Sequence, residues 1–441
     1  MAEPANSVLI IGGGIAGIQA GLDVAEAGLT VYILESQPTL GGKMALLDKT
    51  FPTNDCSICM ESPKMLDTVV NPNIQLLTYC ELKEAKGSVG NFTVSIEVKP
   101  RYVKEDCTAC GKCSEVCIVK TGSEFEQNMT ERRAIYLPFP YAVPRIFTLD
   151  MENCRKYGGG CRACVVVCRD EEGKNCIDLW QRSRTRKLTV GSIIVATGYD
   201  MFSPAAIPEY GFGVYENVVT GLQFERLLNA TGPTAGKLLR PSDGAEPEGI
   251  AFIQCVASRD LRGKPYCSKV CCMYATKLAV LAKEHHAELP VSLFYIDRRY
   301  YGKGHWSLYR RAERMGAEYI RSRPSKVVEL GNQDLRIRYE DSETGRVGER
   351  KVGLLVLCTA LAPSENNKGL AKILGTPLDQ SGFFAEVDPL RRPFETAVEG
   401  IYLCGFCQEP MDIAESVASA SGAAAKAVLA ILKSRVGVGQ R

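Results

Sequence analysis

The sequence predicts an α/β fold built from two parallel-sheet sections, with a cysteine-rich segment inserted into the first. A second section with strand and helix alternation begins near Gly249. Between residues 101 and 187 the apolar pattern gives way to two cysteine clusters, and a buried-strand pattern resumes at 191–198. The first 35 residues predict a strand at 8–11, a turn at 12–14, a helix at 15–27 and a second strand at 30–34. Together these elements form a βαβ unit, which implies a parallel sheet.

Composition narrows the class of protein. A chain of 441 residues is long enough for two or three packed domains, and a net charge of +2 gives no reason to expect nucleic acid as a partner. Nineteen cysteines against three histidines are exceptional. Because the N-terminus lacks the basic region of a signal peptide, these cysteines indicate metal or redox chemistry. The longest apolar stretch, 413–432, carries Glu415 and Lys426, so we expect a soluble helix and membrane attachment only through another subunit.

The βαβ unit carries a dinucleotide-binding motif. Gly12, Gly14 and Gly17 fit G-x-G-x-x-G, in which glycines permit a tight turn, close backbone approach to a pyrophosphate and close helix packing. The helix N-terminus offers unpaired N–H groups to the phosphates. Glu35 ends the second strand and can accept hydrogen bonds from a ribose diol. The predicted contacts in this unit are Gly12, Gly14, Ala16, Gly17 and Glu35.

Three further features favour FAD over NAD as the bound dinucleotide. A glycine pair with a lysine follows the second strand, and an Ala-Thr-Gly sequence ends a later one. The tail from Gly400 resembles a closing flavin motif, although Phe406 stands where an aspartate commonly follows the glycine. The FAD site is therefore predicted to include also Gly42, Lys43, Ala196, Thr197, Gly198, Gly405, Asp412 and Ile413.

The second α/β section lacks the glycines that a nicotinamide site needs. Its turn, residues 253–259, contains none, so the backbone cannot approach a pyrophosphate as closely. We expect this section to keep the fold without an NAD(P)H site. The electron donor is then expected to be something other than NAD(P)H.

Two cysteine runs predict an inserted module with two [4Fe–4S] clusters. The first run is C-x2-C-x2-C-x3-C, the spacing of bacterial ferredoxins, which favours clusters over structural zinc. The second run keeps its last three cysteines at that spacing but has a six-residue gap after Cys154. Because the fourth cysteine of each run ligates the other cluster, the predicted sets are Cys107, Cys110, Cys113 and Cys168, and Cys154, Cys161, Cys164 and Cys117.

The remaining cysteines leave alternatives open. Cys56 and Cys59 are a redox disulfide, a thiolate pair for a partner's cluster, or an inert pair. Cys80, Cys176 and Cys358 are interpreted as packing residues. A third group either replaces the lost nucleotide site with a cluster or consists of buried or reactive thiols, and its members are Cys255, Cys267, Cys271 and Cys272.

These patterns predict a discontinuous FAD-binding domain, and no catalytic proton-transfer group is predicted. Its three pieces are residues 1–100, residues 188–245, which also include a linker, and residues 358–441. The ferredoxin-like module at 101–187 and a second nucleotide-binding-like domain at 246–357 separate them.

With these residues identified, the chain resembles the A subunit of heterodisulfide reductase. The segment Cys-Ser-x-x-Cys-Cys at Cys267–Cys272 is particularly distinctive. The resemblance implies an oxidoreductase with a thioredoxin-reductase-like fold, FAD, an inserted two-cluster ferredoxin module, and a non-standard cluster at the third cysteine group. The shared segments are residues 50–57, 134–144, 253–273 and 412–424.

The chain departs from the longer methanogen subunits, because we expect neither an extra N-terminal domain nor a C-terminal ferredoxin. In this respect it is similar to the A subunit of the quinone-interacting membrane-bound oxidoreductase complex of sulfate reducers. That similarity implies a cytoplasmic electron-transfer subunit of an anaerobic respiratory complex, held at the membrane by its partners. The implied partners are adenylylsulfate reductase, a b-haem quinone-binding membrane subunit, and an iron–sulfur flavoprotein subunit. The alternatives are a stand-alone disulfide reductase using Cys56 and Cys59, and a flavin-bifurcating core subunit.

Overall fold

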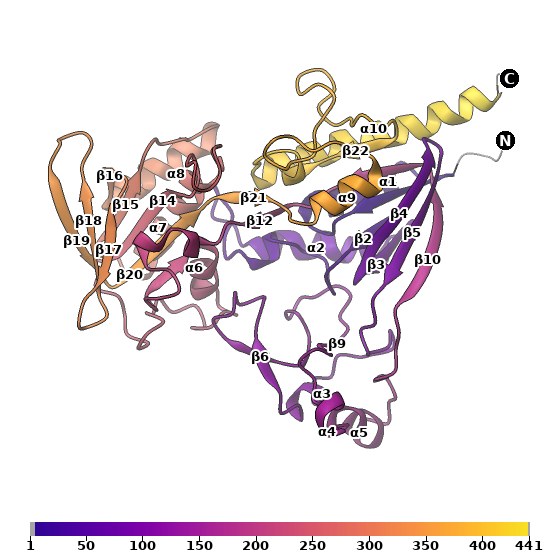
Figure 1. The fold of residues 1–441 in the computed structure, drawn as a ribbon, viewed down its shortest axis with the longest axis horizontal. Coiled ribbons are helices and arrows are strands. Elements are labelled where there is room, and N and C mark those ends of the chain that lie inside the picture. Colours follow the sequence, from indigo (N-terminus) through magenta and orange to yellow (C-terminus); the bar gives the residue numbers. More distant parts are fainter. Residues whose placement is uncertain (1–4, 440–441) are drawn as a thin grey trace. The chain divides into compact units, whose positions relative to one another are not determined.

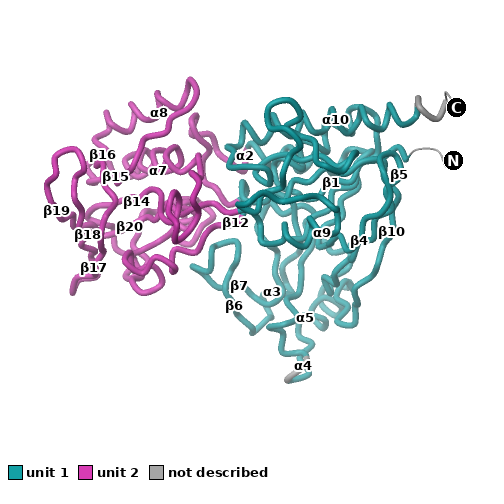
Figure 2. Tube along the Cα trace, turned by 45° about the horizontal axis from the view of Figure 1, so that its top comes forward, with its two compact units in different colours: residues 1–45, 60–199, 363–441 teal, residues 46–59, 200–362 magenta. Residues whose placement is uncertain are grey.

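The computed structural model describes residues 5–439, and the chain divides into two compact units (Figures 1 and 2). Unit 1 comprises residues 1–45, 60–199 and 363–441, and unit 2 comprises residues 46–59 and 200–362. Each unit combines a five-stranded parallel sheet with a three-stranded antiparallel sheet. The elements at which the chain passes from one unit to the other are η1 (Met44–Leu46), α2 (Ser57–Val70), β12 (Tyr199–Met201) and β21 (Leu361–Pro363).

The parallel sheet of unit 1 is built on the predicted βαβ unit. Its strands, in spatial order, are β22 (Ile401–Leu403), β11 (Ser192–Val195), β1 (Ser7–Ile11), β2 (Thr30–Glu35) and β3 (Ile74–Thr78). All five β1 side chains are buried, as expected for a strand covered on both faces of a parallel sheet. Helix α1 (Ile15–Glu26) connects β1 to β2, which confirms the α/β fold class.

Helix α10 (Ile413–Gly439) lies along α1 in unit 1 (Figure 1). Its small residues, among them Ala420, Ala423 and Ala427, are buried and permit close packing. Over Ile413–Arg435 it is also the one described helix whose length and composition would suffice to cross a membrane, with a mean hydropathy of 1.3.

The second layer of unit 1 is antiparallel. Strand β5 (Asn91–Val98) lies between β10 (Arg184–Val190) and β4 (Cys80–Ser88). Alternate β5 side chains, Phe92, Val94 and Ile96, are buried in a core shared with the parallel sheet. Helix α9 (Asn367–Leu374) packs against β4, and η5 (Gly405–Cys407) precedes α10.

The cysteine-rich segment forms a module of short elements between β5 and β10. Its own small core includes Val103, Ile135, Phe147 and Val167, and six of the eight predicted ligand cysteines belong to this core or pack against it. The elements are α3 (Lys112–Glu115), β6 (Lys120–Gly122), β7 (Glu131–Arg133), β8 (Ile135–Tyr136), β9 (Thr148–Leu149), α4 (Lys156–Gly159), α5 (Ala163–Val166) and η2 (Val167–Glu171).

Unit 2 repeats the two-sheet plan. The parallel strands, in spatial order, are β13 (Val218–Thr220), β20 (Leu354–Thr359), β14 (Ile250–Val256), β15 (Val291–Tyr295) and β16 (Ala317–Arg321). The antiparallel strands are β17 (Lys326–Glu329), β18 (Leu335–Glu340) and β19 (Val347–Val352). The helices and short turns are α6 (Gly221–Leu228), α7 (Cys271–His285), α8 (Lys303–Arg314), η3 (Pro204–Ala206) and η4 (Pro208–Tyr210).

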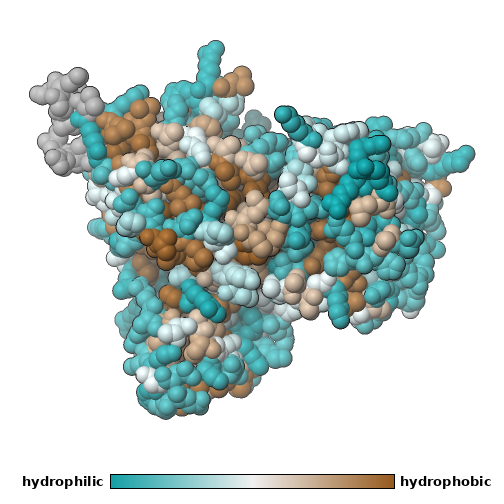
Figure 3. Space-filling view, turned by 180° about the vertical axis from the view of Figure 1, so that it is seen from behind, coloured by the Kyte–Doolittle hydropathy of each residue, from teal (hydrophilic) through white to brown (hydrophobic). Residues whose placement is uncertain are grey.

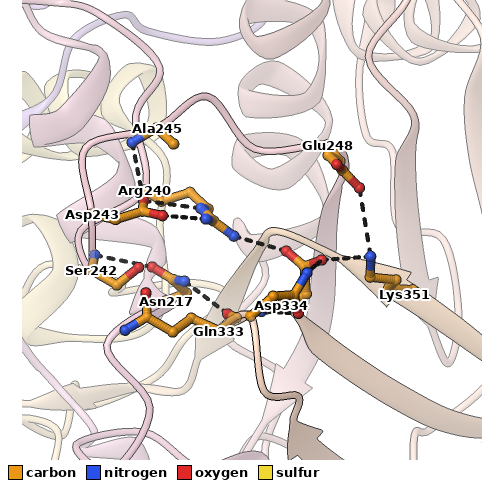
Figure 4. A network of polar contacts seen from close by, with 10 residues as sticks. Asn217, Arg240, Ser242, Asp243, Ala245, Glu248, Gln333, Asp334 and Lys351 are labelled. Carbon is orange, nitrogen blue, oxygen red and sulfur yellow. Dashed lines mark hydrogen bonds and ion pairs between the residues drawn. The ribbon is translucent and has the colours of Figure 1, made fainter.

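A polar network fastens the segment before β14 to the antiparallel sheet of unit 2 (Figure 4). Asp334, buried at the β17–β18 turn, accepts from Arg240 at 2.8 Å and from Lys351 at 2.6 Å. Asn217 donates to the Gln333 carbonyl at 2.9 Å. Burial opposes ionisation of Asp334, but the hydrogen bond and charge of Lys351 outweigh it and hold its pKa below the usual value.

Two features differ from the sequence-based expectation. Residues 200–245, expected to continue the FAD-binding domain and to form a linker, lie in unit 2, because β13 pairs with β20 and α6 packs against α7. The Lys/Ala/Leu-rich residues 275–285 predict a helix; in the structure this helix, α7, begins four residues earlier, at Cys271. Cys271 and Cys272 therefore lie on the first turn of a helix.

Candidate functional site

The turn between β1 and α1 requires glycine at Gly12, and the first turn of α1 requires it at Gly17. Gly12 has φ +118°, and a Cβ there would lie 2.2 Å from the Ala196 carbonyl oxygen. A Cβ on Gly17 would lie 1.9 Å from the Gly12 carbonyl oxygen. Gly14 differs, because its Cβ would meet nothing closer than the Gly42 Cα at 3.8 Å. The space over Gly14, at the N-terminus of α1, is therefore open for a phosphate.

Glu35 closes one side of this turn. Its carboxylate accepts from the Gly13 amide at 2.6 Å and from the Gln37 amide at 2.7 Å. Burial raises the pKa of Glu35, while the amide hydrogen bonds from Gln37 and Gly13 oppose the rise. The carboxylate is thus fixed at the end of β2, where it can accept a ribose hydroxyl.

The other predicted FAD residues frame the same region of unit 1. Gly405 has φ +70°, and its Cβ would lie 2.8 Å from the Ala16 Cβ, so η5 approaches the start of α1. Asp412 and Glu415 cap the start of α10 reciprocally. The Glu415 amide donates to the Asp412 carboxylate at 2.8 Å, and the Asp412 amide donates to the Glu415 carboxylate at 3.0 Å. Thr197 donates to Asn367 at 2.9 Å. Gly198, with φ +68°, follows in the same turn, and Ile413 is the first residue of α10.

Lys43 and Phe406 contribute less to the predicted FAD site than the residues above. Lys43 lies partly buried beside the exposed Gly42. Phe406, at the position where an aspartate was expected, is buried, and its ring centroid lies 4.4 Å from that of Tyr199. The open cradle at Gly14 and Gly42, the fixed Glu35 carboxylate and two helix N-termini together fit an FAD molecule.

In the inserted module, four predicted cluster ligands line one pocket. Cys107, Cys110 and Cys113 come from the α3 loop, and Cys168 comes from η2, more than fifty residues later in the chain. Burial raises the pKa of the Cys113 thiol to about 12, and the neighbouring thiols of Cys107, Cys164 and Cys110 add to the rise. Thiolates this close together need a cationic centre to remain deprotonated.

The four cysteines of the second predicted set also lie close to one another. Burial raises the pKa of the Cys164 thiol to about 11, and the thiols that add to the rise are those of Cys154, Cys117 and Cys161. These are the other three members of the predicted set. Among residues 5–439, no three Cys, His, Asp or Glu side chains converge as ligands of a single metal ion would.

The third cysteine group lies in unit 2, at the carboxyl end of β14 and the start of α7. The Cys271 thiol lies between Cys255 and Cys272 and shares hydrogen bonds with both. Those hydrogen bonds lower the pKa of Cys255 and of Cys272 and raise that of Cys271. Cys267 lies in the loop before α7, where its Sγ accepts the Lys269 amide at 3.3 Å.

The turn after β14 keeps a glycine-like backbone without glycine. Cys255, Ala257 and Arg259 have φ values of 57°, 59° and 57°. L-residues adopt this left-handed conformation at some cost. The turn therefore presents a thiol and side chains where the first unit presents open backbone.

Cys56 and Cys59 form a disulfide at the beginning of α2. The Cys59 amide lies 3.4 Å from the Cys56 sulfur, and the Cys59 side chain is exposed. A disulfide is compatible with the redox pair and with the inert pair among the three alternatives.

Sequence spacing missed two cysteines that adjoin the groups. Cys176 lines the same pocket as Cys107 and Cys168. Burial on β20 raises the pKa of the Cys358 thiol, and the nearby thiols of Cys255 and Cys272 add to the rise. Cys80 is buried in the core of unit 1, as expected of a packing residue.

The glycine turn, the acidic residue at the end of β2 and the two sheet units correspond to the fold of two-dinucleotide-binding flavoproteins. A family model described as FAD dependent oxidoreductase matches residues 7–50. The fold is similar to thioredoxin reductase from T. acidophilum, at a TM-score of 0.54 and 13% identity over 98% of this chain and 100% of that chain. The thioredoxin reductase from Lactococcus lactis is similar at a TM-score of 0.54 and 14% identity, over 97% of this chain and 99% of that chain.

Sequence relatives are more specific. The chain is 48% identical to the second iron-sulfur A subunit of CoB–CoM heterodisulfide reductase from Methanopyrus kandleri, over 98% of this chain and 65% of the relative. It is 45% identical to the A subunit of the H2:CoB–CoM heterodisulfide,ferredoxin reductase of Methanothermobacter marburgensis, over the same shares. The chain is thus homologous to the A subunits of heterodisulfide reductase, and the resemblance to this family is confirmed. It spans about 65% of the length of these relatives.

Proposed function

We propose that the chain is an electron-transfer subunit that holds FAD in unit 1 and iron–sulfur clusters in its inserted module. The observation that carries the proposal is the pocket shared by Cys107, Cys110, Cys113 and the distant Cys168. This arrangement matches the exchange of ligands between two ferredoxin runs. The second set around Cys164 supports a second cluster, and the Cys255 group supports a third.

Different residues of the chain serve flavin binding and electron relay. When bound, FAD accepts two electrons and releases them singly, which couples two-electron donors to one-electron centres. The amides of α1 would hold the pyrophosphate, Glu35 would hold the ribose, and the start of α10 would face the cofactor. The cysteines would hold one-electron centres in positions fixed by the module's core. The absence of glycine at residues 253–259 supports a donor other than NAD(P)H.

For the complex, we propose a quinone-linked respiratory assembly at the cytoplasmic face of the membrane. The partners would be adenylylsulfate reductase, a b-haem membrane subunit, and an iron–sulfur flavoprotein subunit, in anaerobic sulfate reduction. This assignment extends the resemblance inferred from the sequence motifs, and its test is the partner that purifies with the chain. Purification in mild detergent should recover a b-haem partner, and a chain that purifies reproducibly without one contradicts the quinone-linked role.

Two alternatives have observations of their own. The name of the Methanothermobacter marburgensis relative contains both a heterodisulfide and ferredoxin, which favours a bifurcating core subunit. Reduction of the flavin by a hydrogenase partner, with two acceptors reduced together, would support it. The Cys56–Cys59 disulfide favours a disulfide reductase. Turnover that survives Cys56→Ser would eliminate that role.

Metal and flavin content provide the primary test. The anaerobically purified chain should contain about twelve Fe per FAD if all three cysteine groups hold [4Fe–4S] clusters, and about eight if only the module does. A matched Cys271→Ser variant should then lose about four Fe and keep its FAD. A preparation with FAD but no iron contradicts the proposal.

A further inference from the structure

Helix α8 in unit 2 has one buried face and one basic face. Leu308, Tyr309 and Ala312 face the interior. On the opposite side, residues spaced by three or four form one exposed strip, and they are Lys303, Trp306, Ser307, Arg310 and Arg314. Seen from behind, the part of the chain that carries α8 in Figure 1 is covered largely by hydrophilic side chains (Figure 3).

Positive charge is concentrated in this segment. Residues 297–323 contain eight Lys or Arg and three Asp or Glu, a formal charge of +5, whereas the whole chain carries +2. Arg310 is paired with Glu313 at 2.8 Å. Lys303 and Arg314 have no ion-pair partner among the described residues. A partner with an acidic surface would therefore be attracted to this strip.

Trp306 gives the strip an apolar centre. Its side chain is 57% exposed, although tryptophan is normally well covered in folded proteins. Tryptophan and arginine are among the residues most enriched at the positions that contribute most of the binding energy in protein interfaces. The strip therefore combines the charge that attracts a partner with an anchor that would hold it.

The strip is also connected to the third cysteine group. The Cys272 sulfur accepts the Arg299 amide and lies 3.5 Å from the Asp297 carbonyl, so the loop before α8 covers it. The next residue, Tyr300, stacks on Tyr309 with ring centroids 4.6 Å apart. Tyr309 in turn lies 5.1 Å from Trp306. Aromatic rings thus lead from the loop around Cys272 to the exposed strip.

We propose that the basic strip of α8 is the docking surface for a redox protein whose own redox centre is surrounded by acidic side chains. The proposal deepens the electron-transfer function and rests on it for the chemistry of the partner. Exchange of one electron across this surface oxidises one protein, reduces the other by the same amount and breaks no bond. Docking itself requires only the surface.

Binding is measured separately from electron transfer. The chain contains two tryptophans, Trp180 and Trp306, so a Trp180→Phe background makes Trp306 the sole indole reporter on the strip. The probe is an acidic bacterial ferredoxin, and basic cytochrome c is the charge control. We expect the ferredoxin to change Trp306 emission with an affinity that falls as salt rises, and cytochrome c to leave it unchanged.

Charge reversal locates the surface. Arg310→Glu with Arg314→Glu should weaken ferredoxin binding at least tenfold. The control is Arg336→Glu with Arg338→Glu on β18, which changes the net charge by the same amount. Both arginines are exposed, and Arg336 is paired with a glutamate, as Arg310 is on the strip. Equal weakening by both variants, or none by the first, overturns the proposal. Binding that depends on the strip, in a chain without iron, keeps the docking surface and contradicts only the proposed cluster function.

Discussion

Lys277 and Glu225 form an ion pair in the interior of unit 2, with side chains only 1% and 3% exposed. Lys277 also donates to the Lys49 carbonyl at 2.7 Å, and Glu225 accepts the Asp48 amide at 3.1 Å. The pair therefore joins α6 and α7 to the segment before α2. Burial raises the pKa of Glu225, and the Lys277 charge and hydrogen bond oppose the rise.

Removing one partner of this pair should cost more than removing both. We expect Lys277→Met to lower the free energy of unfolding by about 3–5 kcal/mol, because an uncompensated carboxylate is left buried. Lys277→Met combined with Glu225→Leu should recover most of the loss. The denaturant midpoints of Lys277→Met and of the double variant, each compared with the wild type, measure the coupling between the two side chains. Equal midpoints in all three proteins would show that the ion pair contributes nothing to stability.

Glu61 on α2 should make stability depend on pH. It is the one carboxyl among residues 5–439 with both oxygens buried and unpartnered, and burial raises its pKa well above the ordinary value. A raised folded-state pKa means that the folded chain binds more protons, so stability falls as pH rises from about 4.5 through that pKa. We expect Glu61→Gln to flatten this dependence.

The measurement compares the thermal midpoint of wild type and Glu61→Gln at several pH values from about 5 to 8. The difference in favour of the variant should grow with pH. Glu26→Gln, at an exposed position on helix α1 of the same unit, is the control and should leave the slope unchanged. A wild-type slope that Glu61→Gln does not alter contradicts the assignment.

The first dinucleotide unit was predictable because its constraints are local. A positive φ at Gly12 and the contact between Gly17 and the Gly12 carbonyl depend on residues within one turn, and glycine is the signal for both. Cys255 and Ala257 also adopt a positive φ, without that signal. Their conformation depends on the packing around β14, which the sequence does not encode locally.

Tertiary contacts explain what the sequence left out. Cys176 adjoins Cys107 and Cys168 through the fold of the module, and no spacing rule includes it. Helix α7 begins at Cys271 without a capping side chain, so its start carries no sequence signal. Residues 200–245 join unit 2 through the pairing of β13 with β20, which is separated from it by more than a hundred residues.

Gly12 and Gly14 should respond differently to alanine. Gly12→Ala places a Cβ 2.2 Å from a backbone oxygen and should destabilise the fold of unit 1. Gly14→Ala meets nothing closer than 3.8 Å, so stability should be kept while the added methyl weakens FAD binding about tenfold. Flavin titration and thermal melting of the flavin-free chain separate the two effects. Full FAD affinity in Gly14→Ala would place the pyrophosphate elsewhere.

Cys168 should be required for one cluster of the inserted module. It lines the pocket with Cys107, Cys110 and Cys113 from a distant part of the chain, and we expect Cys168→Ser to lose about four Fe while FAD is retained. Cys80→Ser, a buried cysteine in the sheet core, should keep all its iron. Cys176 lines the same pocket, so Cys176→Ser tests the alternative ligand. Loss of about four Fe in Cys176→Ser, with full content in Cys168→Ser, would exchange the two cysteines in the ligand set.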